Sequence, residues 1–173
     1  MAAKRLVSGS CLFISATILL SACKKLPTTA TINFGENTIL VACNPASGGP
    51  DTTIAVAVLI AENSREVRVF GLEMSFDPDI FQYKEIASGN LTGGWTAVDA
   101  NEISPGRLRI GGFAGGGSAI STGSKGALAL VRLKVTAGNP STNLGSQICV
   151  NHFTDDLSRF QPTPACTIFA LKK

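Results

Sequence analysis

The stretch Phe70-Gly71-Leu72-Glu73-Met74-Ser75-Phe76-Asp77-Pro78 decides the fold class of this chain. Its large apolar residues fall at every second position, and the residues between them are small or charged. A period of two is typical of a β-strand with one buried face and one solvent-facing face. Proline fixes φ and aspartate favours turns, so this strand is predicted to end at Asp77-Pro78.

Alternation of the same kind predicts eight further strands along the chain. In one of them Ile54, Val56, Val58 and Ile60 share a face. The eight are expected over 38–43, 52–61, 81–87, from 95–98 up to a turn over 101–106, 107–113, 128–135, 146–151 and 166–171. Eighteen glycines and eight prolines suit the many turns of an all-β domain, and no helical period of useful length appears.

Four stretches carry a resemblance to a known family. They are the opening stretch, the turn and strand Pro105–Ile110, the run Ala127–Val135 and the entry Gly49–Val58. In this order they resemble cohesin modules, the dockerin-receiving domains of cellulosomes. The resemblance implies an all-β, cohesin-like jelly-roll β-sandwich of about nine strands. It also implies a non-catalytic module without a cofactor, which docks a dockerin-type partner that brings its own Ca²⁺.

The N-terminus reads as a bacterial lipoprotein signal. Basic Lys4 and Arg5 precede a short apolar run, and Leu20-Ser21-Ala22-Cys23 is similar to a lipobox. We expect a signal peptide over 1–22, a lipidated tether over 23–37 and the sandwich domain over 38–173. Cys23 would carry the lipid that anchors the protein to a membrane. Lys24 at the next position favours the outer membrane, because an aspartate there is an inner-membrane signal. Plain secretion and a transmembrane helix are the alternatives, but the apolar run is too short for the helix.

Charge and motifs exclude several function classes. Of the 15 basic residues, Lys4 and Arg5 lie in the signal, which leaves 13 against 12 acidic residues and a net charge of +1. No basic stripe for nucleic acid results. The only histidine, His152, has no nucleophile motif beside it. The glycines over 111–118 are not followed by a helix that would hold a phosphate. We therefore predict no catalytic residues and no metal site.

Three cysteines remain after the signal, namely Cys43, Cys149 and Cys166. An oxidising compartment favours one disulfide and one free thiol. A bridge between Cys149 and Cys166 would join the last two strands, and this pairing is favoured. Cys43, at the end of the first strand, could instead pair with either of them.

The resemblance also implies a docking face on one sheet, built from strands that include the opening stretch, 95–98, 107–113 and 128–135. Alternation indicates which residues of these strands point to solvent. The candidate partner-binding residues are Glu73 and Ser75 on one strand, Arg107 and Arg109 on another, and Leu130, Arg132 and Lys134 on the run 128–135. Glu73 matches a position where the family often has Asp, whereas Gly71 replaces a polar residue.

Two alternatives to protein docking stay open. Cellulose-binding modules share the sandwich architecture and hold sugar rings on exposed aromatic residues. Trp95, after Gly93-Gly94, is the candidate stacking residue for a soluble glycan, although a core position is favoured for it. The second alternative is a structural surface lipoprotein without a specific ligand.

Overall fold

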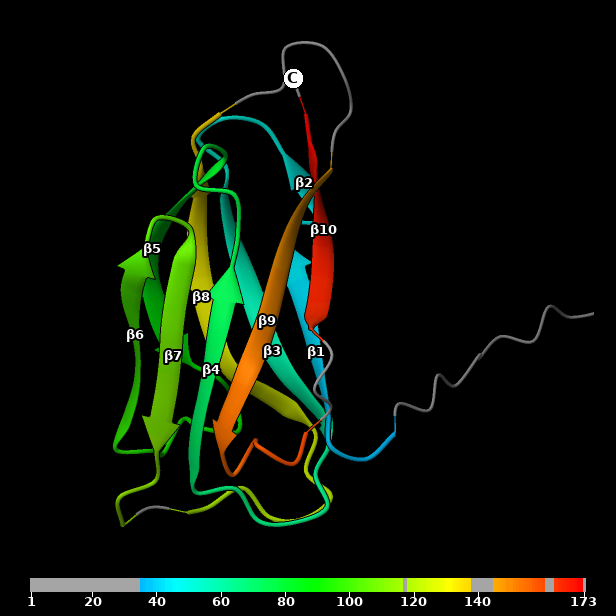
Figure 1. Cartoon of the computed structure of the whole chain (residues 1–173), viewed down its shortest axis with the longest axis vertical. Helices are drawn as coiled ribbons and strands as arrows, with labels where there is room; N and C mark the ends of the chain where they lie inside the picture. The colour runs from blue at the N-terminus through cyan, green and yellow to red at the C-terminus, as the bar shows by residue number, and fades with distance from the viewer. Residues whose placement is uncertain (1–34, 117, 138–144, 161–163, 173) are drawn as a thin grey trace, which may run out of the picture. The chain divides into compact units, whose positions relative to one another are not determined.

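The opening stretch forms strand β4 (Val69–Ser75), as its alternation predicts. The computed structural model describes residues 35–116, 118–137, 145–160 and 164–172 (Figure 1). On β4, Leu72 and Met74 are buried, whereas Glu73 and Ser75 are partly exposed. A turn ends the strand because the backbone N–H of Asp79 donates to the Asp77 carboxylate at 2.9 Å. The compact unit Phe34–Lys173 contains this strand and all the others.

The remaining strands lie where they were predicted, with one addition, but two are longer than expected: 101–104, expected to be part of a turn, and 152–155 both continue a strand. The remaining strands are β1 (Thr38–Asn44), β2 (Ser47–Gly48), β3 (Thr53–Glu62), β5 (Phe81–Ser88), β6 (Ala97–Ser104), β7 (Arg107–Phe113), β8 (Gly126–Val135), β9 (Gly145–Asp155) and β10 (Ala165–Leu171). The two-residue β2 lies in a segment expected to be a turn only. It pairs in parallel with the end of β10, so the described residues form ten strands where about nine were expected.

The strands form two sheets that face each other (Figure 1). One has four strands in the order β1-β3-β8-β5, and the other has six in the order β2-β10-β9-β4-β7-β6. All pairs are antiparallel except β2 with β10. The structure is thus the expected all-β sandwich.

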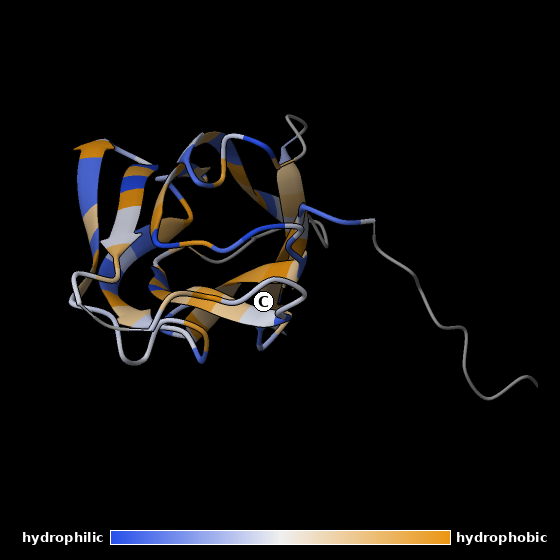
Figure 2. Cartoon of the chain, turned by 90° about the horizontal axis from the view of Figure 1, so that it is seen from below, coloured by the Kyte–Doolittle hydropathy of each residue, from blue (hydrophilic) through white to orange (hydrophobic). Residues whose placement is uncertain are grey.

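The core lies between the sheets and is built from their inward-facing residues. Hydrophobic and hydrophilic residues alternate along several strands in Figure 2. Aromatic rings join the two layers, since Phe81 of β5 contacts Phe169 of β10 with ring centroids 5.6 Å apart. On β3, Ile54, Val56 and Val58 are fully buried, as predicted. In the described part of the chain, no helix has the length and apolar character needed to cross a membrane.

The turn between β6 and β7 requires glycine. Gly106 has φ +73°, a conformation that side chains rarely adopt. A Cβ there would also clash with the carbonyl oxygen of Phe76, because the two atoms would be closer than van der Waals contact allows. In turn the Phe76 N–H donates to the Gly106 carbonyl at 2.9 Å, so this turn fastens the end of β4 to the start of β7.

Candidate docking face

The outer face of the six-stranded sheet brings four of the predicted site residues together. β4 and β7 are adjacent, and their register pairs Glu73 with Arg109 and Ser75 with Arg107. All four side chains point away from the core because Leu72, Met74, Leu108 and Ile110, which alternate with them, are buried. We call the outer surface of β9, β4, β7 and β6 the docking face, after the role that the sequence resemblance predicts for it.

Glu73 is the centre of an ion-pair network on the docking face. Arg107 donates to one carboxylate oxygen at 2.6 Å and Arg109 to the other at 3.0 Å. The glutamate side chain is only 13% exposed although it lies on an outer surface. The hydrogen bond from Arg109, with that from Arg107 and the positive charges nearby, lowers the pKa of Glu73 below its ordinary value. Glu73 therefore stays ionised and holds both arginine side chains in place.

The three remaining face residues lie on the other side of the sandwich. Leu130, Arg132 and Lys134 belong to β8, which pairs with β3 and β5 in the four-stranded sheet. There Arg132 pairs with Glu85 at 2.9 Å and Lys134 with Asp51 at 2.7 Å. The prediction that they share one face with Glu73 is wrong. Alternation shows that a residue points outward, but each sheet has its own outward side, and strand pairing decides which one it is.

The strand that occupies the predicted place of β8 on the docking face is β9, which pairs with β4. Its register contains a β-bulge, because two residues, His152 and Phe153, lie opposite the single Leu72. His152 has φ +50° at this bulge and is exposed, whereas Phe153 packs against the core. The bulge therefore turns His152 to the outer face, where it lines one hollow together with Glu73 and Thr154. The sequence pattern gave His152 no role, since a bulge leaves no mark on simple alternation.

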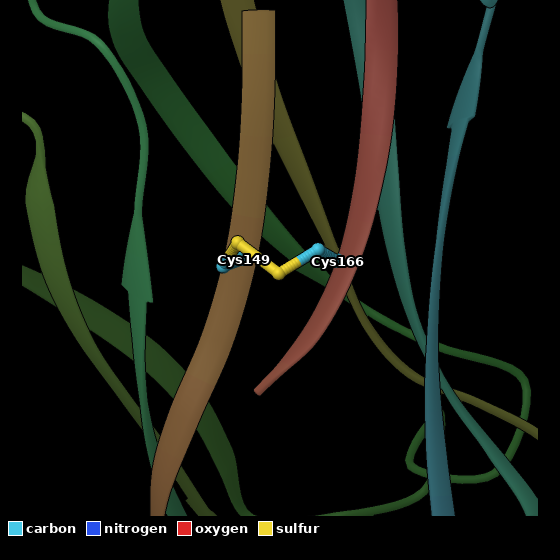
Figure 3. The surroundings of a disulfide bond; sticks show 2 residues. All are labelled: Cys149 and Cys166. Atoms are coloured by element: carbon cyan, nitrogen blue, oxygen red, sulfur yellow. A yellow bond between two sulfur atoms is a disulfide. The ribbon is translucent and has the colours of Figure 1, made fainter. Parts of the chain in front are cut away.

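The predicted disulfide also lies on the outer side of this sheet. Cys149 and Cys166 are direct register partners on β9 and β10, and they are bonded with an S–S distance of 2.13 Å (Figure 3). Cys149 is next to Ser75 of β4 in the register. Cys43 is the free cysteine among the described residues, and its Sγ lies 3.8 Å from the hydroxyl of Thr167.

A groove crosses the docking face at two paired glycines. Gly71 of β4 lies opposite Gly111 of β7, and the row continues to Asp99 on β6 and Thr154 on β9. We call this row and the hollows above it the glycine groove. The hollows measure about 510 and 420 Å³ and share Arg109 and Gly111 in their linings. The pattern missed the groove, because Gly71 and Gly111 are 40 positions apart along the chain.

Trp95, the candidate for sugar stacking, lies in the loop between β5 and β6. Its ring packs on Phe70 with centroids 5.6 Å apart and is partly buried against the core. Its Nε1–H donates to the carbonyl of Ser118 at 3.1 Å. These contacts agree with the core position that the sequence favoured for this residue.

Two other sequence-based predictions concern metals and lipid. Within the described residues, no group of three His, Cys, Asp or Glu side chains is placed to hold a metal ion. The lipidation candidate Cys23 lies outside the described residues, as does the rest of the expected signal peptide over 1–22.

Comparison with known proteins identifies similar structures. No family model and no curated protein sequence matches this chain. Among solved structures, it is similar to the sixth cohesin of scaffoldin B from Acetivibrio cellulolyticus, in complex with a mutant Cel5 dockerin. That similarity has a TM-score of 0.58 and 13% identity, over 75% of this chain and 96% of that chain.

Two further solved structures are similar to the same extent. A non-cellulosomal cohesin from Archaeoglobus fulgidus has a TM-score of 0.56 and 14% identity, over 76% of this chain and 90% of that one. A cohesin module from a Clostridium perfringens family 33 glycoside hydrolase has a TM-score of 0.58 and 15% identity, over 77% and 94%. With these matches and the two-sheet topology, the chain has a cohesin-like jelly-roll fold.

Proposed function

We propose that this protein is a non-catalytic docking module whose docking face binds a protein partner of the dockerin type. The observation that carries the proposal is the ion-pair network of Glu73, Arg107 and Arg109 on the outer face of the six-stranded sheet, over which none of the described strands lies. A network of this kind holds polar groups in fixed positions, which favours specific recognition of a partner. The similar cohesin of scaffoldin B is in complex with a dockerin, which supports a partner of that class.

The proposal includes a membrane anchor. Lipid attached to Cys23 would hold the module at the cell envelope, with the outer membrane favoured by Lys24. One module has one docking face, so it would retain one partner at the membrane. A polysaccharide-degrading enzyme that carries a dockerin fits this role. Metabolic labelling with an alkyne fatty acid tests the anchor, since label must be lost on Cys23→Ala.

Partner capture tests the docking proposal. The full chain, immobilised and exposed to host extract, is expected to retain a protein with a dockerin module, and a calcium chelator should release it. A dockerin depends on Ca²⁺ for its fold, whereas the described part of this chain offers no metal site. Absence of any calcium-dependent partner would overturn the proposal.

Two arginines provide a matched test of which face is used. Arg107 and Arg132 are 52% and 58% exposed, and each pairs with one glutamate, but they lie on opposite sheets. Arg107→Glu is expected to weaken capture at least about tenfold, which corresponds to 1.4 kcal/mol. Arg132→Glu should leave the dissociation constant unchanged. The reverse result would move the binding surface to the four-stranded sheet.

A further inference from the structure

The glycine groove has an open position directly above Gly111. A Cβ built there would approach the carbonyl oxygen of Phe70 at 3.3 Å, and no side chain of the described residues would lie within 4 Å of it. The neighbouring glycine is different. A Cβ at Gly71 would run into the hydroxyl of Thr154 and come within 3.2 Å of the Asp155 carboxylate. The Thr154 and Asp155 side chains therefore lie over Gly71 and form one side of the opening.

Two carboxylates flank the opening. Asp155 lies over Gly71, on the β4 side of the opening. Asp99 of β6, the register partner of Gly111, lies on the opposite side of the opening. Because neighbouring strands are about 4.8 Å apart, Asp99 and Gly71 are separated by about 10 Å. Neither aspartate is among the ion-paired residues of the described chain. Arg109, the nearest cation along β7, is already bonded to Glu73 at 3.0 Å.

The remaining wall of the opening is apolar. Phe113 lies two residues from Gly111 along β7, and Val69 is its register partner on β4. The two residues are 45% and 41% exposed. They are among the few large hydrophobic residues of the described chain that are exposed to solvent. An aromatic ring and an aliphatic side chain beside two carboxylates suit a group with an alkyl stem and a positive end.

We propose that the position above Gly111 receives a lysine or arginine side chain of the docking partner. The alkyl stem lies against Phe113 and Val69, and the cation lies between Asp99 and Asp155. This inference rests on the proposed function for the identity of the partner, because the groove is part of the docking face. The charge of the groove selects the occupant, since each carboxylate already accepts a neutral hydrogen bond, from Thr154 to Asp155 and from the Ala100 N–H to Asp99, and only a cation would supply the missing opposite charge.

A small probe tests the site without the partner. The isotope-labelled full chain is titrated with N-acetyl-lysine methylamide, and its backbone amide signals are followed by NMR. We expect saturable shifts at Gly71, Asp99 and Gly111, and none with the uncharged N-acetyl-norleucine methylamide. Equal shifts with both probes, or none with either, would overturn the inference. So would calcium chloride alone producing the same shifts at about tenfold lower concentration, because the site would then bind a metal ion.

Variants separate the charge of the groove from its shape. Asp99→Asn with Asp155→Asn removes both charges and keeps both side-chain oxygens, so the lysine probe should bind at least about threefold more weakly. Gly111→Val fills the opening and should abolish the shifts. Glu85→Gln with Glu62→Gln removes two negative charges outside the groove as the matched control and should change nothing. Unaltered binding in the Asn double variant would contradict the inference.

The same variants distinguish the two proposals. If the wild-type chain captures a calcium-dependent partner and the Asn double variant captures it equally well, the docking proposal stands and the groove inference fails. If nothing is captured but the lysine probe binds as expected, the groove binds cations and the docking proposal fails.

Discussion

At the scale of single residues, the docking face depends on one glutamate. Glu73 accepts hydrogen bonds from Arg107 and Arg109, which come from the same neighbouring strand. Residues at i and i+2 of a strand point to the same side, so both guanidinium groups reach one carboxylate. The three side chains together carry one net positive charge. The sequence does not reveal this cluster, because Glu73 is far along the chain from both arginines.

The ionisation of Glu73 predicts a pH effect on stability. Its pKa in the folded protein is below the ordinary value of 4.5, mainly because Arg109 donates to it. The stability that the network contributes is fully present above pH 4.5 and is lost as the pH falls through the lowered folded-state pKa. In urea unfolding, the wild type should therefore lose free energy of unfolding more steeply below pH 4.5 than Glu73→Gln does. Parallel pH curves would contradict this account.

Adding one methyl group at Gly106 is expected to lower the stability of the fold markedly. Gly106→Ala places a Cβ at φ +73° against the Phe76 carbonyl, so it should lower the free energy of unfolding by about 1–3 kcal/mol. Gly94→Ala is the matched control, because a Cβ there meets nothing within 4 Å. Denaturant unfolding of the two variants measures the difference, and equal stabilities would show that the turn relaxes without cost.

At the scale of elements, β9 connects the docking face to the end of the chain. Its bulge at His152 shifts the register against β4, and its other edge is joined to β10 by the Cys149–Cys166 disulfide. Without the bulge, the residues after Asn151 would point to the opposite sides. Thr154, which lies over Gly71, owes its position to this one extra residue.

The disulfide predicts the stability of the β9–β10 pair. It closes a loop with a sequence separation of 17 residues, for which chain entropy gives about 3 kcal/mol. Replacing both Cys149 and Cys166 by alanine should lower the free energy of unfolding by about 2–4 kcal/mol, measured by chemical denaturation. Cys43→Ala, the control at the free thiol, should cost under about 1 kcal/mol because that side chain is only half-buried. A double variant as stable as this control would contradict the expectation.

At the scale of the whole sandwich, aromatic side chains hold the two sheets together. Phe169 of β10 is fully buried and packs edge-on against Phe81 of the other sheet. Phe113 of β7 points out of the same six-stranded sheet and is 45% exposed. The same residue type thus has opposite roles in the two positions, and only burial distinguishes them.

This contrast in burial predicts that the same substitution, Phe to Ala, lowers the free energy of unfolding by different amounts at the two positions. Phe169→Ala should lower the free energy of unfolding by about 3–5 kcal/mol, because it leaves a cavity between the sheets. Phe113→Ala removes the same atoms from the surface and should cost less than about 1 kcal/mol. Thermal unfolding compares the two directly. Similar melting temperatures would mean that Phe169 does not bridge the layers.

Much of the local structure follows from the chain alone. Alternation located nine of the ten strands and identified the inward residues of β3, β4, β7 and β8, because a period of two is a property of each strand by itself. The exception, β2, is two residues long and offers no period to detect. The cysteine count predicted one disulfide, and the favoured Cys149–Cys166 pair is the one formed.

Tertiary structure alone decided how these strands combine into a site. Arg132 and Lys134 point outward as predicted, but on the four-stranded sheet, and β9 with its bulge takes their place beside Glu73. The pairing of Gly71 with Gly111, which opens the groove, likewise joins residues 40 positions apart. The sequence determined which side of each strand is buried, since that depends on neighbouring residues. Which strands lie side by side depends on contacts between distant segments, and no local pattern records those.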